Sequence, residues 1–202
     1  MSHVLIRSAG GSVALPDPRT IMIDRLNGGQ LVVFPARRVW DRTALDAAEL
    51  TQWNFLVAAT AIAMLDTLPQ LRDGCINYWD AGNWALHPQA PPIGAKSAPA
   101  HRFLHQHLIG RSPQSSDPCW TWGESPLFPH FRDRYEWSRG KAALTPTECT
   151  QMMPSLTRAL REAYGVHPQA TDLCGSCGYP TPQSDLDATS QLCPDCSGPS
   201  PH

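Results

Sequence analysis

The chain has 202 residues, of which 17% are charged, and a formal net charge of −2 at pH 7. This length suits one ordinary domain with a small appendage. The charge excludes the broad positive field that sequence-independent nucleic-acid binding needs, and no stretch approaches the ~18 apolar residues of a membrane span. We therefore expect a cytoplasmic protein that binds neither membranes nor nucleic acids.

Residues 19–35 predict two strands joined by a turn. Ile21 to Ile23 is apolar, and Asn27 to Gly29 supplies turn chemistry. The run from Leu31 to Phe34 is rich in β-forming residues and ends at Pro35. This pattern is typical of a hairpin or meander.

A long amphipathic helix is predicted from Asp46 to Leu68, where Pro69 ends the pattern. Its apolar residues recur every three or four positions, at Leu50, Trp53, Val57, Ala61, Met64 and Leu68. A strand from Cys75 to Trp79 follows, and after it a proline-rich loop over residues 87–100.

The run from His101 to Arg111 is the most informative part of the chain. Residues i and i+2 of a strand share a face, so Phe103, His105 and His107 line up on one side of a strand predicted over residues 102–109. Two imidazoles this close suit a metal pair, a nucleophile with its helper, or a sheet edge whose histidines are merely hydrogen-bonded.

Residues 113–142 are rich in aromatic side chains that follow no clean period, which predicts a packed loop with short helical turns. The four residues from Thr145 to Glu148 form a capping box with proline at the first helical position. They predict a helix that Pro154 interrupts and that ends at Gly165.

The order of hairpin, long helix, Asn-bearing strand, Gly/Ser loop and His-x-His strand resembles the histidine-triad (HIT) family of nucleotide hydrolases and transferases. The family signature is His-φ-His-φ-His-φ-φ, with φ apolar, and Phe103 stands here in place of the first histidine. The segment from Asn27 to Arg38 is similar to the family's Asn-x-Gly-His-Leu-φ-Val-φ-Pro-x-Arg-His stretch, with Gln30 and Arg38 where histidines are often found. The resemblance covers residues 19–112 and implies an α+β fold, a HIT-like antiparallel sheet with a long helix.

The resemblance also implies a chemistry. His105 would attack the α-phosphorus of a nucleotide and form a covalent nucleotidyl-histidine, which water or another acceptor resolves. His107 would assist the leaving oxygen by hydrogen bonding or proton transfer. The substrate would carry a phosphoanhydride or phosphoramidate bond, as in a dinucleoside polyphosphate. Family members commonly form homodimers through the long helix and a sheet edge.

Further contacts to the nucleotide are expected from the strand and loops around the histidines. The candidates are Asn27, Asn77, Gly94, Lys96, Ser97 and Trp84. For the asparagines the alternative is ordinary hydrogen bonding in a turn or strand, and for Lys96 it is a solvated charge. Trp84, like Trp79, suits either stacking on a base or packing in the core.

Four of the seven cysteines form two tight pairs near the C-terminus. Cys174 and Cys177 are followed, after fifteen residues, by Cys193 and Cys196. This spacing fits the C-x2-C-x15-C-x2-C zinc template, so the module resembles a zinc ribbon with structural Zn²⁺. Disulfides or free thiols are the alternative. Residues 172–202 hold no Lys or Arg, which favours stabilisation or a protein partner over phosphate binding.

We therefore expect a HIT-like nucleotide-binding domain over residues 1–142 and a helical connector over 143–166. A small C-terminal zinc-ribbon-like module with a disordered tail would span 170–202. The leading hypothesis for function is an enzyme, a nucleotide hydrolase or nucleotidyltransferase. The alternatives are a non-catalytic nucleotide-binding protein and an interaction adaptor that works through the cysteine module.

Overall fold

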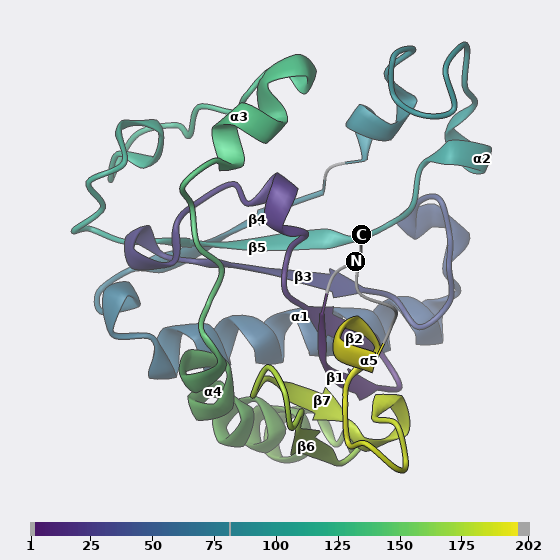
Figure 1. Cartoon of the computed structure of the whole chain (residues 1–202), viewed down its shortest axis with the longest axis vertical. Coiled ribbons are helices and arrows are strands. Elements are labelled where there is room, and N and C mark those ends of the chain that lie inside the picture. Colours follow the sequence, from purple (N-terminus) through teal and green to yellow (C-terminus); the bar gives the residue numbers. More distant parts are fainter. Residues whose placement is uncertain (1–2, 81, 198–202) are drawn as a thin grey trace.

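The computed structural model describes residues 3–80 and 82–197 and is built around a five-stranded sheet (Figure 1). The strand order is β1-β2-β3-β5-β4, and every neighbouring pair is antiparallel. The strands are β1 (Val4–Ser8), β2 (Gly11–Ala14), β3 (Gln30–Phe34), β4 (Cys75–Trp79) and β5 (Gln106–Arg111). The predicted α+β class with an antiparallel sheet is confirmed.

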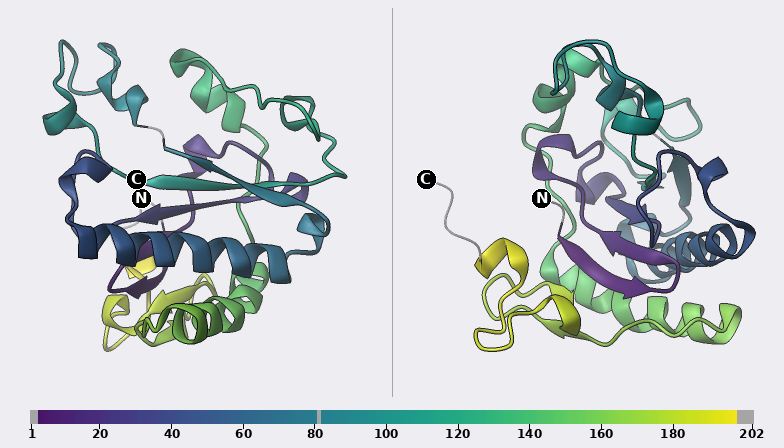
Figure 2. Two further views of the ribbon diagram at one scale, coloured as in Figure 1. Left: turned by 180° about the vertical axis from the view of Figure 1, so that it is seen from behind. Right: turned by 90° about the vertical axis from the view of Figure 1, so that its right-hand side faces the viewer.

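Helix α1 (Ala47–Thr67) crosses one face of this sheet (Figure 2). It begins at a capping box in which Asp46 accepts from the backbone N–H of Glu49, while the Glu49 side chain accepts from the backbone of Asp46. Leu68 caps the C-terminal end, so the predicted helix is confirmed within one residue at each end. Its buried residues include Trp53, Leu56, Ala59, Ala63 and Met64.

Helix α4 (Pro146–Arg158) packs against the side of α1 that faces away from the sheet (Figure 2). It begins with the predicted capping box at Thr145. The predicted interruption at Pro154 is wrong, because the helix continues past it into a π-helical turn, Ala159–Ala163. An interior proline removes one helical hydrogen bond and crowds the preceding turn, but here the helix is held by a fully or nearly buried face of Cys149, Met152, Met153 and Leu156.

The part of the sheet formed by β1 and β2 differs from the sequence-based expectation. The hairpin of β1 and β2 was not predicted, and the partner of β3 on this side is β2. The predicted strand from Ile21 to Ile23 is wrong. Met22 bonds to side chains instead of a neighbouring strand: its N–H donates to Gln30 Oε1 at 2.8 Å, and its carbonyl accepts from Trp120 Nε1 at 3.0 Å.

The loops 82–105 and 112–133 lie on the face of the sheet opposite α1 (Figures 1 and 2). They carry the short helix α2 (Ala98–His101) and lead into α3 (Arg134–Ser138). A second apolar cluster lies beneath them, formed by Met22, Ile23, Ile109 and Trp120. The expected packed loop with short helical turns is confirmed.

The cysteine module contains β6 (Thr171–Leu173), β7 (Pro180–Pro182) and α5 (Pro194–Ser197). It lies against β1, where the Arg7 guanidinium pairs with the Asp185 carboxylate at 2.8 Å. The proposed division into three units stays a prediction, and the predicted disordered tail falls on residues 198–202, outside the described part. Within residues 3–80 and 82–197, no helix is long and apolar enough to cross a membrane.

Candidate active site and metal centre

His105 and His107 lie together at the start of β5. The strand begins at Gln106, four residues after the predicted start, so Phe103 and His105 precede it, and it extends two residues beyond the predicted end. Leu108 faces the core beneath α1, whereas Ile109 joins the cluster under the loops, so His107 points to the loop side. The two imidazole rings stand nearly perpendicular, with centroids 4.8 Å apart and an interplanar angle of 80°.

Gln30 determines which nitrogen of His107 carries the proton. The Oε1 of Gln30 accepts from the backbone N–H of Met22, so its amide nitrogen must face His107 Nδ1, at 2.8 Å. Since an amide NH₂ only donates, Nδ1 accepts and the proton resides on Nε2. Burial, with a smaller contribution from His105, lowers the pKa of His107 to about 3. His107 is therefore a neutral imidazole that donates through Nε2.

His105 adopts the opposite tautomer. Its Nδ1 lies 2.8 Å from the main-chain oxygen of Phe103, and a carbonyl only accepts, so Nδ1 carries the proton and Nε2 keeps its lone pair. Burial lowers the pKa of His105, partly offset by this hydrogen bond and by the charge of Asp80. The ring stays neutral at pH 7, which leaves a nucleophilic nitrogen available.

Phe103 contributes its main chain, and its ring turns outward. The ring is 37% exposed, and the Arg38 guanidinium lies 3.4 Å from its centroid. The contact to the neighbouring histidine therefore comes from a carbonyl that any residue at this position would supply.

Both histidines line a cavity of about 190 Å³ whose other walls are mostly apolar. Trp79 lies directly across from His107 on β4, with ring centroids 5.3 Å apart. Trp84 meets Trp79 edge-on at 6.1 Å and lines the same cavity. The remaining walls come from Thr20, Met22, Gly82 and Ala85.

The other predicted nucleotide contacts are not gathered at this cavity. Lys96 Nζ donates to the carbonyls of His87 and Ala90 within its own loop, at 2.5 and 2.7 Å. Ser97 precedes α2 without a capping hydrogen bond, and Gly94 has open space around it. None of these three lines the cavity.

The two asparagines also lie outside the cavity wall. Asn27 Oδ1 accepts from the backbone N–H of Ser116 at 2.9 Å and so anchors the loop after β5. Its turn is pressed against the strand, because a Cβ on Gly28 would lie 2.1 Å from the oxygen of Gly110. Asn77 pairs with Ile109 and faces the loop side two residues from Trp79.

The sequence reasoning missed the residues that fix the tautomers. The sequence indicated Gln30 as a replacement for a histidine. It indicated neither the hydrogen bond from Gln30 to His107 nor the one from His105 to the Phe103 carbonyl. The available signal for Gln30, which is 1% exposed, was a polar residue between the turn and the apolar run from Leu31 to Phe34.

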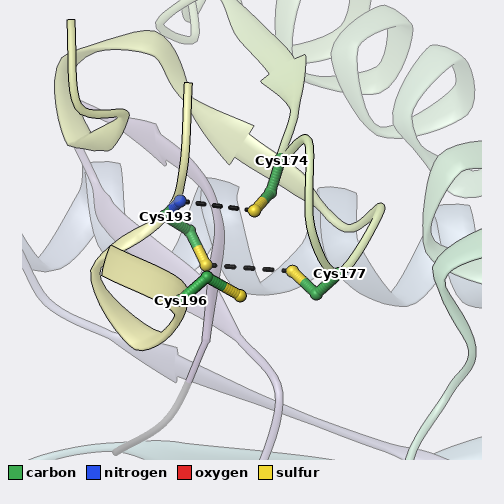
Figure 3. Close-up of side chains that lie close together, drawn as sticks. All are labelled: Cys174, Cys177, Cys193 and Cys196. Carbon is green, nitrogen blue, oxygen red and sulfur yellow. Dashed lines mark hydrogen bonds between the residues drawn. The ribbon is translucent and has the colours of Figure 1, made fainter. Parts of the chain in front are cut away.

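The four C-terminal cysteines converge as predicted (Figure 3). Their sulfur atoms all lie within 4.8 Å of one another, and Cys177 Sγ is 3.8 Å from Cys193 Sγ. A tetrahedral zinc with Zn–S bonds of about 2.3 Å places neighbouring sulfurs about 3.8 Å apart. All seven cysteines are free thiols, so the disulfide alternative is not seen.

The surroundings of the cluster favour the thiolate form at Cys174, whereas burial raises the pKa of Cys177 and Cys193. Burial raises the pKa of Cys174, but backbone N–H groups of Cys177, Cys193 and Ser176 outweigh it and lower the pKa to about 6. The N–H of Cys193 donates to Cys174 Sγ at 3.3 Å (Figure 3). Such donors support a metal-bound sulfur as well as a free one. The cluster can thus hold one metal ion in a closed four-sulfur site.

Comparison with known proteins adds no family assignment: no family model, curated protein or solved structure matches this chain.

Proposed function

We propose that this protein is a nucleotide hydrolase or nucleotidyltransferase that works through a covalent nucleotidyl-histidine on His105. The observation that carries the proposal is the pair of opposite tautomers in one cavity. His105 presents a bare Nε2 and His107 presents an Nε2–H. A nucleophile and a hydrogen-bond donor 4.8 Å apart, measured between ring centroids, suit attack on a phosphoryl group.

The order of elements along the chain supports the same proposal. A 21-residue helix, the strand that carries Asn77 and the strand that carries His107 come in the sequence that the HIT resemblance predicts. The last two are neighbours in the sheet.

In the first step, the lone pair of His105 Nε2 forms a bond to phosphorus while the bond from phosphorus to the leaving oxygen or nitrogen breaks. The ring becomes a cation, and its Nδ1–H remains bonded to the Phe103 carbonyl, which stabilises the charge. In the second step, water or another acceptor attacks phosphorus, loses a proton to solvent and releases His105 in its neutral form.

His107 acts in these steps as a hydrogen-bond donor and keeps its proton. Giving up the Nε2 proton would leave an imidazolate, because Nδ1 already accepts from Gln30. Accepting a second proton at Nδ1 would break that bond. His107 therefore stabilises a phosphoryl oxygen as charge develops there, and the leaving group takes its proton from solvent.

The two tryptophans supply the place for the base. Trp79 and Trp84 offer aromatic walls beside His107, and such walls stack on any nucleobase. Trp79 is itself stacked on Phe128, with centroids 4.4 Å apart, which holds its ring in place.

The cysteine cluster would hold a structural Zn²⁺ through Cys174, Cys177, Cys193 and Cys196. Four sulfurs fill a tetrahedral site and leave no position for a reacting water. The ion would supply folding free energy to a segment with little core of its own.

Trapping of the covalent intermediate tests the function. The protein is incubated with nucleotides labelled at the α-phosphate, namely a nucleoside triphosphate, a dinucleoside tetraphosphate and a nucleoside phosphoramidate. We expect an acid-labile adduct that mass spectrometry locates on His105. His105→Asn should lose it, and His101→Asn should keep it, because the His101 ring bonds to the main-chain oxygen of Ser97 at the start of its own helix, α2, and does not line the cavity.

Two other outcomes would support the alternatives. A wild-type protein that forms no adduct, yet binds nucleotide as tightly as His105→Asn, would be a non-catalytic nucleotide-binding protein. No nucleotide binding at all, together with a protein partner lost on removal of residues 170–202, would favour the adaptor.

A further inference from the structure

Arg111, the last residue of β5, is a buried cation with no carboxylate partner. Its relative exposure is 5%. Nη2 donates to the main-chain oxygens of Thr121 and Glu124, at 2.6 and 3.2 Å. Among the described residues no Asp or Glu carboxylate lies within ion-pair distance of its guanidinium. Carbonyl dipoles, and no carboxylate of the described residues, therefore face the positive charge.

Part of the guanidinium has no hydrogen-bond partner. Nε is buried without one, and Nη1 makes no hydrogen bond to the described chain. The Trp120 ring lies 5.6 Å from the guanidinium carbon and shields one side. An arginine presents five donors in a planar fork, and a buried charge left this way is costly unless an anion pairs with it.

The same arginine lines a cavity of about 290 Å³ at the end of the sheet. Cys75 pairs with Arg111 across β4 and β5, so their side chains share a face. Trp122, 43% exposed, and Gly123 form the rim. Glu124, an exposed residue, also lines the cavity and contacts Arg111 through its main-chain oxygen.

We propose that this cavity binds an oxyanion, a phosphate or carboxylate group of a small molecule, through the Arg111 guanidinium, whose Nη1 has no partner in the described chain. An oxyanion accepts a charge-assisted hydrogen bond from a guanidinium N–H, and the Trp122 ring, which lines the cavity, can cover the rest of the ligand. The cavity shares no lining residue with the histidine site. The proposal thus stands independently of the function proposed above.

Anion titration of the full chain tests the site. Inorganic phosphate, acetate and chloride are added at equal ionic strength while the Arg111 Nε–H and Trp122 indole signals are followed by NMR. We expect saturable shifts with phosphate or acetate and none with chloride. Whichever of phosphate and acetate binds more tightly identifies the chemical group that the cavity takes. Arg111→Lys, which keeps the charge but loses the planar guanidinium donors, should weaken binding at least about tenfold. Equal, unsaturable responses to all three ions would overturn the proposal.

A second variant keeps the test valid if substitution of Arg111 disturbs folding. Cys75→Glu places a carboxylate on the exposed side chain opposite the guanidinium. In the absence of phosphate, we expect Cys75→Glu to have a higher Tm than the matched control Cys75→Gln. Only Cys75→Glu should lose the NMR shifts that phosphate induces. If Glu and Gln variants have the same Tm and respond alike to phosphate, Arg111 does not need an anion and the proposal is wrong.

Discussion

Gln30 and His107 are joined across β3 and β5 by a hydrogen bond of 2.8 Å from the amide nitrogen to Nδ1. The bond is directional because Met22 holds the other end of the amide. A single buried side chain thus sets the proton position of a ring in the candidate active site.

Replacing this donor with an acceptor should reverse the tautomer. In Gln30→Glu the carboxylate faces Nδ1, so we expect the proton to move to Nδ1 and the pKa of His107 to rise well above about 3. Nitrogen-15 NMR of the imidazole measures both changes. Adduct formation on His105 should fall about 10- to 100-fold through loss of the Nε2–H donor. An unchanged Nε2–H signal would show that Gln30 does not select the tautomer.

The pH dependence of adduct formation should follow His105. Burial places its pKa below the ordinary 6.5, so the neutral nucleophile predominates at pH 7 and is lost only as the pH falls through the lowered value. We expect a constant rate from pH 8 to about 6.5 and a decline below it. Rapid-quench measurement of the labelled adduct gives the profile. A midpoint above 6.5 would contradict the lowered pKa.

His107 should make the fold less stable in mild acid. Its folded pKa of about 3 lies below the ordinary 6.5, so between these values the unfolded chain binds a proton that the folded chain does not. Stability is then full above pH 6.5 and falls with decreasing pH, by at most about 1.4 kcal/mol per pH unit.

Urea unfolding of wild type and His107→Gln from pH 7 to 5 measures this slope. The variant should show the shallower dependence, whereas His101→Gln, which changes a more exposed ring, should behave as wild type. Parallel slopes in wild type and His107→Gln would mean that His107 is protonated in the folded protein.

Metal analysis of protein purified under reducing conditions should give one zinc per chain. Cys177→Ser should reduce the bound metal strongly and unfold the module, because an incomplete thiolate set loses the free energy that zinc supplies. Cys149→Ser is the matched control, since Cys149 is a buried thiol of α4 outside the cluster. Retention of full zinc by Cys177→Ser would exclude the four-sulfur site.

The packing of the cysteine module (residues 170–197) against β1 should be stabilised modestly by the ion pair of Arg7 and Asp185. Their contact includes the 2.8 Å ion pair and two further bonds from Arg7 Nε, at 3.1 and 2.9 Å. A double-mutant cycle with Arg7→Ala and Asp185→Asn should give a coupling of about 1 kcal/mol, near the upper end for a partly exposed pair. The midpoint of thermal unfolding is the measurement, and additive effects would mean that other contacts hold the module.

Features set by neighbouring residues could be predicted from the sequence. Helix α1 follows from its apolar period and from Asp46 and Glu49, which lie three residues apart. The sulfur cluster follows from two short knuckles. The side of β5 that carries His107 follows from strand alternation alone.

The rest depends on contacts between distant residues. Gln30 and His107 are 77 positions apart. All four residues of β2 are buried, so this strand lacks the alternation by which a strand is recognised. Lys96 was expected at the nucleotide, but carbonyls of its own loop hold it. Nothing in local spacing distinguishes a loop that folds back on itself from one that reaches a cavity.

The pairing of β5 on both edges has an evolutionary consequence. Both its neighbours, β3 and β4, fix its register, so an insertion between His107 and Arg111 would turn one of them to the opposite face. The loops on the same side of the sheet carry no such constraint. Under the proposed function, a change of substrate would therefore be expected to map to the length and sequence of those loops, and not to β5.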